Sequence, residues 1–481
     1  MTIADKLTTI AGIKTDIRTA INGKGGSLTS GSPFSAYSAA ISSLPSGGGG
    51  GASSTDWSQI GYTEVPQAFQ DEFSYAKNIH DNWDPTVTNL SNKFSGDRTL
   101  VYMPLVDTSN VTGMYSMFSN CTNMIYVPLL DTSNVTNMNL MFNGCTGLTT
   151  VAAFNTSACT DMGSMFNGCT RLTSVPAFNT SACTNMSNTF KNCSGLTTVP
   201  LFDTSSVTTM ANMFDNCKRL TATPAFNTSA VTTMRGMFSG CTSLTEVQLF
   251  DTSNVTDMSH MLHDTSGLTT VPLFDTSSVT DMSHMFENDK RLTTLPAFNT
   301  SACTNMNSMV RLCSGLISIP QFDTRSVTGM GSMFENCSSI TVIPALNTSG
   351  VTDMGSMFIY SSSLQKITSL DMDKCTNFNY MFGYSGSLSN LRFMLLKGLG
   401  TPSGVTSYAN ARMENCTNWG VADDTYTDAR QSLVDSLLTY SFDRATAGYS
   451  TCTIKLSSNS YNQLTAQELA DIQAKGYNIT T

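Results

Sequence analysis

The sequence predicts an α/β solenoid, a single elongated stack of 24-residue repeats, or rungs, each contributing a short strand and a helical turn. An Asp or Asn recurs every 24 residues through twelve copies, from Asp107 to Asp371, with no insertion or deletion. One copy holds only about eight apolar side chains, too few to offset the conformational entropy lost on ordering a rung alone. Neighbouring rungs must therefore complete each other's core, as in repeat proteins. Positions 24 residues apart are said below to share a column.

The rung at residues 274–300 shows the elements expected in every copy. Its "FDTSSV" is a turn, and Thr280 is the predicted N-cap of a helical turn. The apolar residues of "DMSHMF" fall at i, i+3 and i+4, the spacing of one helical face. The following "LTTLP" is predicted to be a short strand, with Pro296 at its end because proline cannot donate to a strand ladder.

The part of the chain before the repeats divides into three segments. Residues 1–44 form a predicted helical segment for anchoring and oligomerisation, since their apolar residues follow coiled-coil spacing. Residues 45–55 are a Gly/Ser-rich linker, expected to be a flexible tether. Residues 56–105 hold an N-terminal cap and a degenerate repeat. The apolar seam of the first segment consists of Ile3, Leu7, Ile10, Ile17 and Ile21.

The solenoid itself is assigned to residues 106–394, and residues 395–481 form a C-terminal capping block. This block lacks the 24-residue period but holds "TDARQSLVDSLLTY", a predicted helix, and "CTIKL", a predicted strand. Thr465 and Glu468 form a capping box at the start of a last helix, which Gly476 ends. A solenoid needs its last apolar rung covered, and this block can do so.

The Met, Phe and Cys columns are interpreted as core. Two columns hold 22 of the 28 methionines and lie beside a Phe column, so we expect Met to fill gaps in the interior rather than to form a binding surface. The Cys columns are predicted to be buried free thiols, because one of them alternates with Val; an array of disulfides is the alternative. Cys416 and Cys452 lie outside the columns, and the sequence does not say whether they pair. The first Cys column is Cys121, Cys145, Cys169, Cys193, Cys217, Cys241, Cys313 and Cys337, and the second is Cys159, Cys183, Cys303 and Cys375.

Two features raise the question of metal binding. The Asp/Asn column, followed by Thr-Ser, is expected to be a ladder of turns in which each side chain bonds nearby backbone amides; calcium binding is the alternative. His260, His263, His284 and Glu287 lie on two adjacent rungs, about 5 Å apart by strand spacing. They are either solvated side chains of two near-duplicate rungs or a site for a divalent metal ion. No other cofactor is expected.

Recognition must come from columns that vary between copies. The column of Ser119 differs at almost every rung, and the column of Asn123 carries several arginines. We expect both columns to face solvent and to bind a partner, with a wide, weakly charged face that suits a glycan. The candidate binding residues are Lys191, His263, Glu287 and Arg311.

The composition argues against several functions. The net charge is −10 and only 12% of residues are charged, with no cluster of Lys and Arg, which argues against nucleic-acid binding. No stretch of 18 apolar residues exists, so no membrane insertion is expected. The N-terminus has no apolar region typical of a secretory signal. The array has no inserted loop that could build a catalytic carboxylate pair, so we expect no enzyme.

Over residues 83–394 the repeats "VTDMSHMF", "LTTLP" and "FDTSSVT" resemble the BspA-like leucine-rich repeats of bacterial surface proteins and some bacteriophages. This resemblance implies a leucine-rich-repeat array, in a family whose proteins are mostly adhesive or of unknown role. The C-terminal "LTAQELADIQAKGYNI" is similar to the caps that follow such arrays. The N-terminal "LTTIAGIKTDIRTAINGKGG" and "PFSAYSAAI" resemble the opening of bacteriophage structural proteins of the fibre type.

Together these resemblances imply a bacteriophage virion structural protein, either a fibre or an accessory head or tail decoration, whose array binds the host cell surface. The missing secretory signal favours this over the alternative, a bacterial cell-surface adhesin, because a virion protein is made in the host cytoplasm. Residues 1–44 would then bind other virion proteins, and the chain would form a homo-oligomer, with a trimer as the guess from other fibres. The expected partner is a host surface glycan or glycoprotein. A solenoid polysaccharide-degrading enzyme is a third interpretation.

Overall fold

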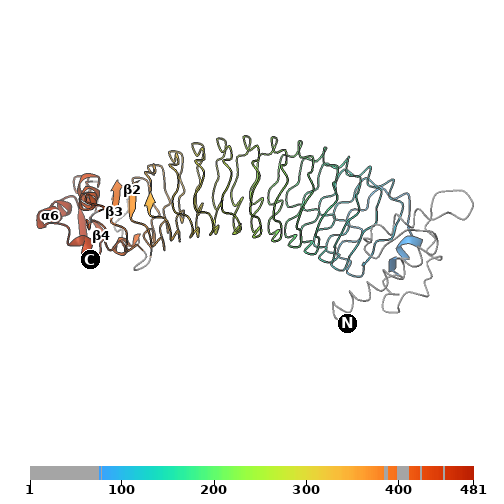
Figure 1. Ribbon diagram of the computed structural model, residues 1–481, viewed down its shortest axis with the longest axis horizontal. Coiled ribbons are helices and arrows are strands. Elements are labelled where there is room, and N and C mark those ends of the chain that lie inside the picture. Colours follow the sequence, from blue (N-terminus) through green and yellow to red (C-terminus); the bar gives the residue numbers. More distant parts are fainter. Residues whose placement is uncertain are drawn as a thin grey trace, which may run out of the picture.

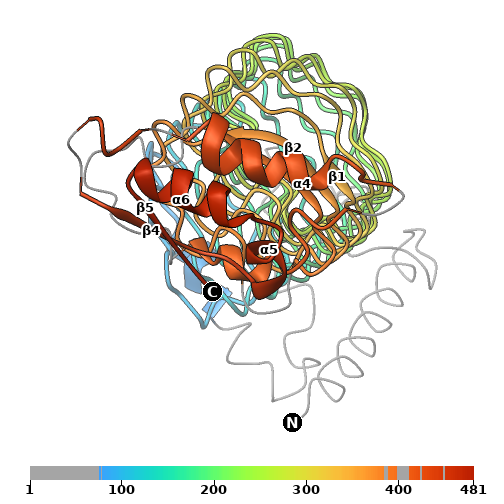
Figure 2. The ribbon, with the colours of Figure 1, turned by 90° about the vertical axis from the view of Figure 1, so that its left-hand side faces the viewer.

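The computed structural model describes residues 75–76, 78–383, 388–397, 411–422, 425–441, 443–447 and 450–481. Over these residues the chain is a long, gently curved stack of rungs that ends in a small block of helices and strands (Figure 1). Viewed along the stack, successive rungs superimpose as nested loops (Figure 2). The predicted segments 1–44 and 45–55, and the first part of 56–105, lie outside the described residues.

Parallel backbone pairing joins the rungs. Single parallel bridges connect residues 24 positions apart, beginning with Asn89 and Gly113 and ending with Asp353 and Asn377. Each rung adds hydrogen bonds around these bridges: in one rung the amide of Phe286 donates to the Met309 carbonyl at 2.9 Å. The stack is therefore held by backbone bonds along its axis.

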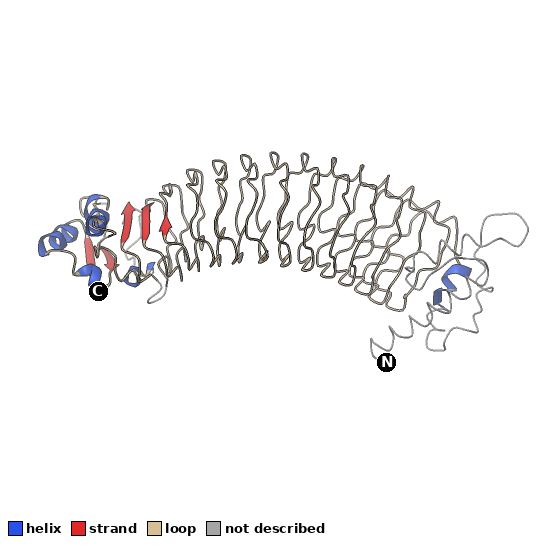
Figure 3. Cartoon of the chain, in the orientation of Figure 1, coloured by secondary structure: helices blue, strands red, loops and turns tan. Residues whose placement is uncertain are grey.

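The predicted helical turn in each rung is wrong. His284 and Asn288 have φ of 58° and 67°, in the left-handed region that no right-handed helix contains. The segment is instead a chain of tight turns, in which the amide of Met285 donates to the Met282 carbonyl at 3.3 Å. Thr280 is not an N-cap, since its hydroxyl donates to a carbonyl of the preceding rung. Within the described array the solenoid therefore has turns where helices were expected (Figure 3).

The left-handed residues form two columns. The second of these is mostly Asn and Gly, the residues that adopt this conformation at least cost. This Asn/Gly column just before the Cys column was the sequence signal against a helix. The second column reads Gly96, Asn120, Gly144, Gly168, Asn192, Asn216, Gly240, Asp264, Asn288, Leu312, Asn336 and Tyr360.

The predicted strands form only in the last rungs. These are β1 (Val342–Ile343), β2 (Lys366–Asp371) and β3 (Phe393–Lys397), a parallel sheet in the order β1-β2-β3. The preceding described rungs lack strands at "LTTLP", and in most of them a proline follows and cannot donate the next ladder bond. Pro344 follows β1 in this way, whereas Thr368 takes its place inside β2 and the pairing continues.

The C-terminal block lies against β3. Its elements are the 3-10 helix η4 (Met413–Asn415), helix α4 (Ala429–Val434), the π-helix η5 (Asp435–Thr439), β4 (Cys452–Lys455), α5 (Ser458–Tyr461), α6 (Ala466–Ala474) and β5 (Tyr477–Thr480), with β4 and β5 paired in parallel. The indole of Trp419 is buried and donates to the Met394 carbonyl at 2.9 Å, which ties the block to β3. The predicted capping box of Thr465 and Glu468 is present at the start of α6. None of the helices in the described part of the chain is long and apolar enough to cross a membrane.

The interior is built from the Met, Phe and Cys columns, as predicted. Met282, Met285 and Phe286 are fully buried, and successive phenylalanines of the Phe column stack, with Phe118 and Phe142 5.5 Å apart. All fourteen cysteines are buried and free, so the disulfide alternative is wrong. Each thiol of the first Cys column donates to a carbonyl of the preceding rung, adding a side-chain bond to the stack.

The predicted Asx ladder is also confirmed. In one rung the carboxylate of Asp275 accepts bonds from the amide of Ser277 at 3.0 Å and from its hydroxyl at 2.7 Å. The threonine between them, Thr276, is buried, and its hydroxyl donates to the Asn299 carbonyl of the next rung at 2.8 Å. Each "DTS" or "NTS" therefore closes a turn and also bonds to the neighbouring rung.

We expect the native protein to react slowly with a thiol reagent, because its thiols are buried and burial raises their pKa, to about 12 for Cys121. After denaturation close to fourteen thiols should react. Spectrophotometric titration with and without denaturant measures both values. A thiol count far below fourteen in the unreduced, denatured chain would contradict the buried-thiol interior.

A second prediction concerns the left-handed turns. Asn336 has φ of 56°, and glycine occupies the same column in Gly144 and Gly240. Asn336→Val should destabilise the protein by about 1–3 kcal/mol, because a β-branched residue is strained in this conformation. Asn336→Gly should change stability by less than about 1 kcal/mol, because glycine adopts this conformation without strain and loses only some extra backbone entropy on folding. Denaturant unfolding compares the two variants, and equal stabilities would show that the backbone can relax away from the left-handed turn.

Candidate binding surface

The column of Ser119 forms a continuous polar ladder along the solenoid, here called the outer ladder. Its side chains contact one another from rung to rung. The side-chain amide Nδ2 of Asn143 donates to the Ser119 hydroxyl at 3.2 Å, and Nδ2 of Asn167 donates to Oδ1 of Asn143 at 2.9 Å. Because neighbours cover each other, the column that was expected to face solvent does so only in part. Its members are half-buried or buried. They are Ser119, Asn143, Asn167, Lys191, Asp215, Ser239, His263, Glu287, Arg311, Glu335 and Ile359.

Charges of opposite sign alternate along the outer ladder. Lys191 pairs with Asp215 at 2.8 Å, and Arg311 lies between Glu287 at 2.5 Å and Glu335 at 3.0 Å. Glu287 is only 7% exposed, so of the four predicted binding residues it is the one that solvent barely reaches. Lys191, His263 and Arg311 remain half-exposed.

The predicted histidine cluster does come together. The rings of His260 and His284 stack with centroids 4.4 Å apart, and the ring of His263 meets His260 edge-on at 5.6 Å. His284 Nδ1 lies 2.5 Å from a Glu287 carboxylate oxygen, whose other oxygen pairs with Arg311. Among the described residues no group of three or more His, Cys, Asp or Glu side chains is arranged to hold a metal ion. A divalent-metal site at His260, His263, His284 and Glu287 stays a prediction.

The environment of this cluster shifts two pKa values. Burial, together with the neighbouring His284 and His263, lowers the pKa of His260 to about 4. Burial alone would raise the pKa of Glu287, but hydrogen bonds from His284 and Arg311 outweigh it and lower the pKa to about 2. At neutral pH His260 is therefore neutral and Glu287 is ionised.

The Cys column is interrupted just inside the histidine cluster. Thr265 and Asp289 stand in this column, both fully buried, and the Thr265 hydroxyl donates to Asp289 Oδ1 at 3.0 Å. Asp289 Oδ2 has no hydrogen-bond partner. Burial raises the pKa of Asp289 well above its ordinary value, because the buried site favours the protonated carboxyl group over the carboxylate.

The column of Asn123 is exposed where it carries arginine. Arg171, Arg219 and Arg291 all reach solvent, as the sequence predicted. The outer ladder and this column together are called the outer face below.

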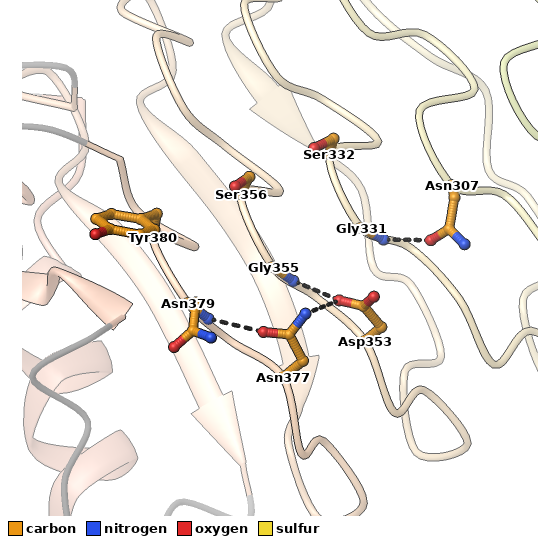
Figure 4. A pocket seen from close by; sticks show the side chains of 9 residues that line it. All are labelled: Asn307, Gly331, Ser332, Asp353, Gly355, Ser356, Asn377, Asn379 and Tyr380. Carbon is orange, nitrogen blue, oxygen red and sulfur yellow. Dashed lines mark hydrogen bonds between the residues drawn. The ribbon is translucent and has the colours of Figure 1, made fainter.

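Two surface features were missed by the sequence reasoning. One is a row of exposed leucines directly after the proline column: Leu201, Leu249 and Leu273 are 63%, 65% and 59% exposed. The alternation of "PLFD" with "PAFN" was the available signal. The other is a shallow polar groove where Gly331 and Gly355 follow each other in one column (Figure 4). Paired glycines on adjacent rungs could have indicated it.

The chain belongs to the protein family described as Mycoplasma protein of unknown function, DUF285. Overlapping matches to the family cover residues 63–125, 88–200, 124–224, 184–291, 221–317, 267–342 and 312–393, more than half of the chain. Comparison with curated proteins finds no match to this chain.

The fold is also similar to solved bacterial structures. A leucine-rich cell surface protein of Faecalibacterium prausnitzii is 16% identical, with 64% of this chain and 87% of that chain covered and a TM-score of 0.30. A leucine-rich repeat protein of Bacteroides ovatus is 14% identical, with 79% and 88% covered and a TM-score of 0.29.

The buried carboxyl group yields a pH-dependent prediction. Because the pKa of Asp289 is higher in the folded chain than its ordinary 3.8, the folded state is penalised as pH rises above 3.8 and the unfolded chain ionises. Asp289→Cys, which restores the column, should therefore stabilise the protein by about 1–3 kcal/mol at neutral pH and by less below pH 3.8.

Denaturant unfolding over a pH series measures this difference. Ser361→Cys is the matched control, because it fills a gap in the same column on a rung away from Asp289 and removes no carboxyl group. A gain from Asp289→Cys that does not vary with pH would show that Asp289 is not held in its protonated form.

Proposed function

We propose that this protein is a surface-binding protein whose solenoid attaches to a cell surface through the outer face. The observation that carries the proposal is the contrast between columns. The interior Met, Phe and Cys columns repeat almost unchanged, whereas the outer ladder differs from rung to rung in size, charge and polarity. A surface that varies while its scaffold does not is suited to recognition.

The chemistry of the outer face favours a glycan or glycoprotein over a strongly charged partner. The charges of the outer ladder are paired, Lys191 with Asp215 and Arg311 with Glu335, so they largely cancel. The other polar side chains of the outer face carry amide and hydroxyl groups, which can form hydrogen bonds with sugar hydroxyls. The exposed arginines at 171, 219 and 291 add separate cationic points.

Two carriers fit such an array. The first is a bacterial cell, with the protein as a surface adhesin. The second is a bacteriophage virion, with the protein as a fibre or an accessory decoration; the apolar seam in residues 1–44 and the Gly/Ser-rich segment 45–55 favour it, since such a segment suits attachment to other virion proteins and homo-oligomerisation.

Labelled antibody distinguishes the carriers, because it binds either intact bacteria or purified virions. Deleting residues 1–44 should leave a soluble array that unfolds cooperatively and no longer joins its carrier. Incorporation at the normal level would place the anchor elsewhere in the chain.

The binding prediction uses the exposed arginines, because Glu287 is buried in an ion-pair network and its loss would disturb the fold. The triple variant Arg171→Ser, Arg219→Ser, Arg291→Ser takes the serine found in this column at Ser243. Exposed side chains contribute little to stability, so unfolding should shift by less than about 0.5 kcal/mol. Binding of labelled protein to target cells should weaken by about tenfold.

The matched control removes three charges from the turn column instead: Asp203→Asn, Asp251→Asn, Asp275→Asn, since Asn stands there in other rungs. Cell binding of this control should be unchanged. Equal binding by wild type and the arginine variant would show that the outer face is inert.

A further inference from the structure

The polar groove arises from two missing side chains. In other rungs its central column carries large residues such as Tyr115 and Arg235 or small ones such as Ala211 and Gly163. Gly331 and Gly355 are the place in the described array where glycine occupies this column in two successive rungs. The lack of side chains at Gly331 and Gly355 leaves a depression of about 360 Å³ on the surface of the stack (Figure 4). This volume is at the lower end of ligand sites, the scale of one small unit rather than of an extended ligand.

Hydrogen bonds to the backbone fix the polar side chains of the groove. Asn307 Oδ1 accepts the Gly331 amide at 2.7 Å, and Asp353 Oδ1 accepts the Gly355 amide at 2.9 Å and the Asn377 side chain at 2.8 Å. Each of these groups keeps a further bonding atom, the amide nitrogen of Asn307 and Oδ2 of Asp353, for which the described part of the chain supplies no hydrogen bond. The groove therefore offers preorganised donors and acceptors.

An aromatic ring lies at one end of the groove. Tyr380 lines it and is 39% exposed. The guanidinium group of Arg412 lies 5.5 Å from the ring centroid, which restrains the ring. Tyr380 gives the groove a flat apolar surface next to its amide groups (Figure 4).

We propose that this groove binds one neutral sugar residue of a surface glycan. A pyranose ring has hydroxyls that match fixed amide and carboxylate groups and a C–H face that packs on an aromatic ring. Among the described residues that line the groove, Asp353 is the one carboxylate, and it would repel an anionic sugar at the end of the groove away from Arg412, so the ligand is a neutral hexose or N-acetylhexosamine. The proposal rests on the surface-binding function above and assigns it a specific subsite.

The first test fills the groove. The full chain is titrated with the methyl glycosides of glucose, galactose, mannose and N-acetylglucosamine, with saturation-transfer NMR as the readout. Wild type should bind at least one of the four, and Gly331→Tyr should abolish that binding. Ala211→Tyr is the matched control, because it adds the same side chain to the same column on a distant rung, and Tyr115 shows that the column accepts tyrosine. Binding of none of the four by wild type would overturn the proposal.

A second variant guards against misfolding of the first. Tyr380→Ser removes the ring and installs the residue found in the same column at Ser356, whose φ of 58° is close to the 55° of Tyr380. The variant should fold normally and lose affinity by about tenfold. Undiminished affinity in both variants would overturn the proposal.

Cell binding separates this proposal from the wider function. If wild type binds cells and sugar but the groove variants lose only the sugar, the groove is a sugar site and cells are held by the outer face. If the groove variants keep sugar binding, the subsite assignment fails while surface binding stands. If wild type binds the sugar but no cells, the surface function fails and the subsite stands.

Discussion

The structure depends on one constraint: backbone amides of each rung must meet carbonyls of the next at a fixed 24-residue offset. The amides of Met282 and Phe286 donate to the following rung, and that of Thr280 to the preceding one. Buried Thr hydroxyls and Cys thiols add bonds along the same axis. A single inserted residue would displace every bond on its rung. This explains why twelve copies keep one length and why no loop grows out of the array.

The same constraint shapes the surface chemistry. In a stack, each side chain lies about 5 Å from its equivalents on neighbouring rungs, so a repeated charge would repel itself. The columns accordingly use neutral Thr, Ser and Asn, or alternate the sign of charge, as in Glu287, Arg311 and Glu335. The low proportion of charged residues follows from this geometry. It leaves a surface on which recognition depends on hydroxyl and amide groups.

Local departures from the repeat are where distinct properties arise. In the interior, Asp289 stands where other rungs carry a thiol, and burial with one carboxylate oxygen unpartnered raises its pKa. On the surface, Gly331 and Gly355 remove two stacked side chains and open a polar groove beside Tyr380. Both departures are tolerated because the surrounding rungs keep their backbone bonds. A single substitution can therefore give one rung a distinct property while the rung keeps its length of 24 residues.

The sequence by itself determined the period, the core columns, the free buried thiols, the Asx turns and the capping box of Thr465. These features follow from residue type, because buried positions require apolar side chains and local hydrogen bonds require particular polar ones. Only the tertiary structure decided that "DMSHMF" is a chain of tight turns with a left-handed residue at His284, since apolar spacing reports which side chains are buried and not where the amides point. It also decided that the outer ladder is half-covered and that two glycines make a groove. Both depend on what the neighbouring rung supplies, which no single rung encodes.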